Sequence, residues 1–216
     1  MPEPEERPHE IDNDWYWVNN WRVEGRLWDN EKEHNANKAM KYLREHGFSK
    51  WAAAGIVGNM WAESFMSPGQ WEFPTGTDTG TGGYGLVQWT GTPNPYIQWA
   101  EENDWVWEHN GDLQMQRLTF ERQTNIEFVG HPPDYPIGWN GYAHIEPQEG
   151  EDDYDAVNYA AAAFVYCYLR PAAGQIEATL SNRQYHSRYV FTYCPGDPYP
   201  AWLLFKMSER SKGRYR

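Results

Sequence analysis

Residues 60–90 read MWAESFMSPGQWEFPTGTDTGTGGYGLVQWT and are the most informative stretch of this chain. One carboxylate, Glu63, stands near the end of an apolar run. A glycine-rich segment separates it from residues 84–89, YGLVQW. Glycine permits sharp turns and a close approach of backbone to a ligand. We therefore expect an acid at a helix end facing a short hairpin of glycines and aromatics, a layout typical of a polysaccharide-cleaving cleft.

The residues before Glu63 predict a helix over 50–64, with Ser49 as its N-cap. Apolar side chains recur at helical spacing, at Ala53, Ile56, Val57, Met60 and Trp61. Glu63 follows Ile56 by seven positions, which brings the two within about 20° on the helix surface. The carboxyl group should then point toward the buried side, at the helix end where the dipole disfavours a negative charge.

Apolar surroundings and the helix dipole both favour the protonated form of such a carboxyl group. A protonated acid is what glycosidic cleavage needs, because it donates a proton to the leaving oxygen. The helix alone also allows a plainer interpretation, in which Glu63 caps its neighbours or pairs with an arginine.

Composition limits the classes of partner. The 216 residues suit one domain, and the net charge of -13 argues against nucleic acid, whose binding needs clustered Lys and Arg. The 13 Trp and 15 Tyr have flat apolar faces with polar edges, which suit sugar stacking and protein interfaces equally well. Bacterial cell walls often carry anionic polymers, so long-range charge would not attract an acidic wall-degrading enzyme to its target. We expect such an enzyme to be delivered by being tethered to something.

Several other features are expected to be absent. The start, MPEPEERPHE, is acidic and proline-rich where a signal peptide would have a basic region. No stretch of the sequence approaches the long apolar run of a membrane-spanning helix. The seven histidines lack ligand spacing, so we predict neither a metal nor a cofactor. Cys167 and Cys194 are expected to be free buried thiols, and a single disulfide bond between them is the alternative.

We expect three parts: an acidic and aromatic arm over 1–34, a catalytic domain over 35–190 and an extension over 191–216. The arm should pack on its own core or on a neighbouring subunit. Trp99 and Trp105 are among the expected anchors of the domain, together with Leu113, Leu118 and Phe128. We expect helices over 35–46, 50–64, 93–109, 112–129 and 153–169, a short hairpin within 70–90, and a loop over 131–150.

The motif Ala62-Glu63-Ser64, followed by Pro68 and by residues 84–89, resembles the lysozyme-like superfamily and, within it, the phage tail lysozyme family. The similarity extends upstream through segments of 35–60 and downstream through Gly69, Trp71 and residues 96–100. It covers about residues 35–185 and is strongest between 47 and 100.

This resemblance implies a mainly α fold (α+β lysozyme-like), a helical bundle around a cleft with a small β-hairpin, that cleaves the glycan strand of peptidoglycan. Glu63 matches the catalytic acid. The implied substrate contacts are Ser64, Tyr84, Gly85, Gln88, Trp89 and Trp71. For Tyr84 and Trp89 the alternative is packing in the core.

A second carboxylate is less well defined. Asp78, fifteen positions after Glu63, and Glu72 could each serve as base or stabiliser at the separations that glycosidases use. The family pattern fixes no acid in this loop. Enzymes of the superfamily that have a single catalytic acid instead let the substrate assist in the reaction. One departure stands out: relatives tend to carry a glutamate before Arg-Pro, whereas this chain has Leu169 there, which puts full activity in doubt.

Taken together, these features predict a muramidase carried on a phage virion that opens the host wall during genome delivery. Its expected partners are the peptidoglycan strand and other virion proteins, bound through the arm or the C-terminal tail, with no nucleic acid and no membrane insertion. A lytic transglycosylase with the same cleft is one alternative. The other is a structural virion protein that keeps the fold without catalysis.

Overall fold

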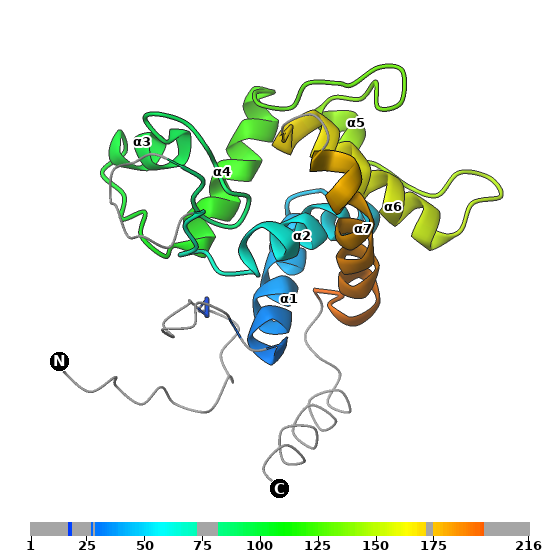
Figure 1. The fold of residues 1–216 in the computed structure, drawn as a ribbon, viewed down its shortest axis with the longest axis horizontal. Helices are drawn as coiled ribbons and strands as arrows, with labels where there is room; N and C mark the ends of the chain where they lie inside the picture. The colour runs from blue at the N-terminus through cyan, green and yellow to red at the C-terminus, as the bar shows by residue number, and fades with distance from the viewer. Residues whose placement is uncertain (1–16, 19–26, 28, 73–81, 172–174, 197–216) are drawn as a thin grey trace, which may run out of the picture.

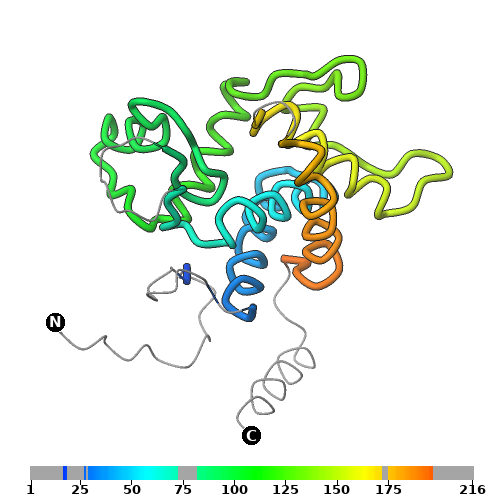
Figure 2. Tube along the Cα trace, viewed as in Figure 1, coloured from blue at the N-terminus to red at the C-terminus, as the bar shows by residue number. Residues whose placement is uncertain are grey.

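A computed structural model describes residues 17–18, 27, 29–72, 82–171 and 175–196. Its helices surround α2 (Lys50–Ser64), which contacts α1 (Asp29–Glu45), α6 (Asp153–Phe164) and α7 (Gln175–Tyr193). Figure 1 shows α2 in the middle of this group. In the tube view (Figure 2), residues 82–124 lie to one side of α2 and residues 153–193 to the other.

Helix α2 is buried almost all round, which suits its apolar sequence and its central place. Its start is capped as predicted, because the Ser49 hydroxyl oxygen accepts a hydrogen bond from the amide of Ala52 (3.2 Å). It ends at Phe65, whose φ of 52° is left-handed. The predicted helix over 50–64 is therefore confirmed at both ends.

The predicted helix over 153–169 is confirmed, and its last turn has a different geometry. Asp152 and Asp155 form a reciprocal capping box at the start of α6. After Phe164 the chain continues as one π-helical turn, η1 (Val165–Leu169), and Arg170 ends it with a left-handed φ of 47°.

Other predicted elements differ in extent. Helix α1 begins at Asp29, earlier than the expected 35, and α4 (Gly111–Thr124) ends before 129. Only α3 (Pro95–Glu101) forms within 93–109, because the chain turns at Asp104, where φ is 58°. Trp105 then lies at the surface with 42% of its area exposed, so its expected role as a core anchor is wrong.

Two elements were not anticipated. The expected loop over 131–150 contains the short helix α5 (Trp139–Ala143), because the buried indole of Trp139 anchors it in the core. Helix α7 was not predicted at all.

The β structure is small, as expected for a mainly α protein of this kind. Trp71 pairs with Tyr84, and Tyr84 pairs with Trp89, as isolated antiparallel bridges. The expected fold class, mainly α and lysozyme-like with a small β element, is confirmed. Within the described residues, every helix is too short or too polar to cross a bilayer.

Candidate functional site

Glu63 lies in the last turn of α2, and its side chain is 22% exposed. Its Oε1 is 2.6 Å from Nη2 of Arg183, a side chain of α7 that is only 7% exposed. This contact is a charge-assisted hydrogen bond and matches the plainer interpretation, in which Glu63 pairs with an arginine. The expectation of a carboxyl group in apolar surroundings is therefore wrong, because α7 brings a buried cation to it.

The guanidinium group of Arg183 is held on three sides. Besides its contact with Glu63, Nη1 donates to Oδ1 of Asn59 (3.0 Å) and Nε donates to Oγ1 of Thr179 (3.2 Å). The amide of Asn59 is itself fixed, because it donates to the carbonyls of Gly55 (2.8 Å) and Ala161 (3.1 Å). The orientation of Glu63 thus depends on a network that joins α2, α6 and α7.

Ser64 connects the end of α2 to the turn over 84–89. Its buried hydroxyl donates to the carbonyls of Met60 (2.9 Å) and Leu86 (3.1 Å). The side chain has no exposed surface, so it faces the protein and not solvent. Its contribution to the site is to hold the turn beside the last turn of α2.

The turn is also fastened from α4. Oε1 of Gln114 accepts from the amide of Leu86 (2.7 Å), and its Nε2 donates to the carbonyl of Pro68 (2.7 Å). Gly85 has a φ of 82°, and a Cβ there would lie 2.6 Å from Oε1 of Gln114. The glycine is therefore required by a close approach to Gln114. Gln88, half-buried, donates from Nε2 to the carbonyls of Gly85 (2.8 Å) and Gln70 (3.0 Å).

The rings of Tyr84 and Trp89 lie in the core, 1% and 6% exposed. Both stack on Tyr96, with ring centroids 6.1 and 5.0 Å away. The hydroxyl of Tyr84 accepts from the amide of His109 (2.9 Å), and burial raises the pKa of Tyr84 to about 12. These contacts match the core-packing alternative. Trp71 is half-buried, with its ring 4.5 Å from that of Tyr84, and so keeps some surface for a ligand.

Of the two acids considered as a second carboxylate, Asp78 lies outside the described residues. Glu72 is exposed, and its Oε2 accepts a hydrogen bond from the amide of Gly83 (2.9 Å). The amide of Glu72 donates in turn to the carbonyl of Gly83 (2.8 Å). These two contacts hold Glu72 beside Gly83.

Leu169 ends η1 and packs partly buried against the core. The next residue, Arg170, pairs with Glu127 (3.2 Å) at the surface. The acid that pairs with Arg170 thus comes from the segment that follows α4, and not from position 169.

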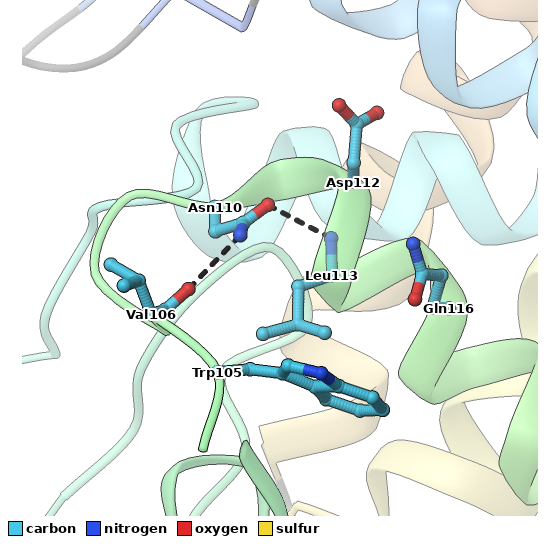
Figure 3. A pocket seen from close by; sticks show the side chains of 6 residues that line it. All are labelled: Trp105, Val106, Asn110, Asp112, Leu113 and Gln116. Carbon is cyan, nitrogen blue, oxygen red and sulfur yellow. Dashed lines mark hydrogen bonds between the residues drawn. The ribbon is translucent and has the colours of Figure 1, made fainter. Parts of the chain in front are cut away.

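A separate hollow of about 400 Å³ lies at the start of α4 (Figure 3). Asp112 and Gln116, which line it, are each two positions from Gln114 and so lie about 200° from it on the helix. The hollow therefore opens on another face of α4 than the one that holds the turn. Its full lining is Trp105, Val106, Asn110, Asp112, Leu113 and Gln116.

Arg183 is the site residue that sequence reasoning missed. The buried residues of α7 are Arg183, Ser187 and Val190, which have helical spacing but include only one apolar side chain. A search for apolar periodicity therefore had no signal there. For metals, no cluster of three or more His, Cys, Asp or Glu that could hold an ion occurs among the described residues.

Comparison with known proteins places the site within a recognised region. The sequence model of the family described as phage tail lysozyme matches residues 34–193, which include both Glu63 and Arg183. The chain is also 31% identical over 138 residues to "Morphogenesis protein 1" of Bacillus phage B103. That alignment covers 64% of this chain and 34% of the relative, so the chain spans about a third of the relative's length.

Proposed function

The chain belongs to the phage tail lysozyme family, and on this premise we propose that it is a peptidoglycan-cleaving muramidase of a bacteriophage virion. It would open the host wall locally while the genome is delivered. Its substrate is the glycan strand, and its own partners are other virion proteins.

The placement of Glu63 carries this proposal. Glu63 lies in the last turn of the central helix, and its side chain is 22% exposed. The next residue, Ser64, holds the turn over 84–89 beside it. Trp71 and Gln88, both half-buried on the small β element, remain the side chains best placed to contact a saccharide.

In this mechanism Glu63 gives its proton to the oxygen that bridges two amino sugars. The bond from that oxygen to the anomeric carbon breaks, and water supplies a hydroxyl to the carbon and a proton back to Glu63. Glu63 has to carry a proton for the first step.

A zymogram that compares native protein with Glu63→Gln tests the proposal. Glutamine is close to glutamate in size and can still accept a hydrogen bond from Arg183, but it has no proton to give. We expect a loss of clearing of at least about 100-fold. The matched control is Glu127→Gln, which changes an exposed glutamate that also pairs with an arginine. Equal clearing by native protein and Glu63→Gln, or none by either, excludes the enzymatic function.

Mass spectrometry of the released muropeptides then identifies the reaction. A muramidase adds water across the broken bond, whereas a lytic transglycosylase leaves an anhydro-sugar end, so the products differ in mass by one water.

A second candidate is a structural virion protein that keeps the fold without catalysis. One observation favours it: Glu63 pairs with Arg183 at 2.6 Å. Leu169, at the position where the family resemblance leads us to expect an acid, agrees with it. The name of the phage B103 relative, a morphogenesis protein, agrees with such a role. Absence of clearing by folded native protein on several wall types would support this second candidate.

A further inference from the structure

We propose that Arg183 is the positioning residue of the site, so that α7, and not α2 alone, fixes the direction of the Glu63 side chain. This inference rests on the proposed function only for its kinetic consequences. The physical coupling between the two side chains stands on the structure and is measurable without any enzyme activity.

The contacts of Arg183 fix the orientation of its guanidinium group. A planar guanidinium group donates in fixed directions, and each of the three directions used by Arg183 ends on a defined acceptor: Glu63, Asn59 and Thr179. A group anchored at two points can hold the third partner in one orientation. The Glu63 side chain, partly exposed at a helix end, would otherwise be free to rotate into solvent.

The helix that carries Arg183 is itself packed tightly against α2. Helix α7 approaches α2 closely because residue 58 is glycine: a Cβ there would overlap the hydroxyl and the backbone of Ser187. Ser187 lies one helical turn after Arg183. The contact that brings the helices together thus also sets the distance from Arg183 to Glu63.

No other charged side chain shares this role in the part of the chain that the structure describes. Among those residues, Arg183 is the only charged group within ion-pair distance of Glu63. The guanidinium is nearly buried, so solvent screens its attraction for the carboxyl group less than it would at the surface. Removing it should leave Glu63 less well oriented.

The direct test is carboxyl-carbon NMR, at one neutral pH, of protein labelled in its glutamate side chains, with the Glu63 signal assigned by its loss in Glu63→Gln. We expect the carboxyl-carbon chemical shift of Glu63 to move in Arg183→Met, which keeps an apolar stem but removes the hydrogen-bond donors. In the control Arg170→Met, which breaks the exposed pair with Glu127, the Glu63 signal should stay in place. An unmoved Glu63 signal in folded Arg183→Met overturns the inference.

Kinetics supply a second readout that loss of stability alone would not produce. In Arg183→Met the kcat should fall about tenfold or more with little change in KM, because the orientation of Glu63 is lost. Arg183→Lys, which keeps the charge but not the three-way geometry, should restore kcat only in part.

The two proposals fail in different ways. If native protein clears no wall, the muramidase proposal fails, while the NMR measurement still tests whether Arg183 holds Glu63. If Arg183→Met does not fold, Thr179→Val removes one support of the guanidinium with a side chain of equal shape. A Glu63 carboxyl signal that keeps its native position in both Thr179→Val and Arg183→Lys would overturn the inference.

Discussion

Gln114 joins segments that are far apart in the sequence. It is fully buried, and its amide group serves both the amide of Leu86 and the carbonyl of Pro68, each at 2.7 Å. These two backbone groups have no access to water, so the side chain replaces the solvent they lost on folding. One residue on α4 thereby fixes the spacing between the end of α2 and the turn.

Replacing Gln114 with alanine should be costly. The change leaves a buried N–H and a buried C=O without their partner, at about 1–3 kcal/mol for each group. We expect the free energy of unfolding, measured by urea denaturation, to fall by about 2 kcal/mol or more. The matched control is Gln116→Ala on the exposed side of the same helix, which should stay within about 0.5 kcal/mol of native. Equal losses in the two variants would contradict the assigned role.

The residues of the site differ in how well the sequence predicted them. Glu63 was found because it belongs to a local motif beside an apolar helical pattern. The same motif could not show whether Tyr84 and Trp89 line a cleft or fill the core, since both roles need an aromatic ring. Arg183 is brought to Glu63 only by the packing of α7, a contact 120 residues away in sequence that no local pattern records.

At the scale of elements, the packing of α7 on α2 depends on a small residue on each side. Gly58 faces Ser187, and the two helices meet with no space for a methyl group between them. Glycine weakens a helix interior relative to alanine, so its presence in α2 is offset by the close contact that it permits.

Gly58→Ala should therefore destabilise the protein, although alanine is the better helix former. We expect a loss of about 2–3 kcal/mol from overpacking, read as a lower Tm in calorimetry. Gly141→Ala in α5 is the control, because a Cβ there would meet its nearest neighbour, Ile137, at 3.4 Å, an ordinary contact. That change should be neutral or slightly stabilising. A stable Gly58→Ala variant would show that α7 can shift freely.

The elements that carry strong local signals were the ones predicted well. Ser49 and the Asp152–Asp155 pair mark helix starts by their own chemistry, so α2 and α6 were placed correctly. With Trp99 and Trp105 as apolar anchors, the sequence predicted one helix over 93–109. The chain instead turns at Asp104, and no local pattern revealed this turn. Helix α7 was missed because its buried face is largely polar.

For the whole molecule, the mainly α fold followed from the family resemblance, whereas composition alone allowed many folds. The family match over 34–193 agrees with the expected extent of the resemblance. Composition did contribute the net charge of -13, which determines whether the protein and an anionic bacterial cell wall attract or repel each other.

Salt should accelerate wall clearing. A protein of charge -13 and a wall rich in anionic polymers repel each other, and ions screen this repulsion over about 8–10 Å near 0.1–0.15 M. Turbidity assays at low and at physiological ionic strength should show faster clearing at the higher one. Walls stripped of their anionic polymers serve as the control and should lose most of this dependence. Slower clearing with added salt on intact walls would contradict the argument.

The two cysteines of the chain, Cys167 and Cys194, are free and buried. Burial raises the pKa of both thiols, so little of the reactive thiolate is present at neutral pH. The covalent structure of the fold is therefore the same under reducing and oxidising conditions. Under the proposed function, the protein would be assembled in the reducing interior of one cell and would act at the oxidising surface of another. It would make that passage without forming or losing a cross-link.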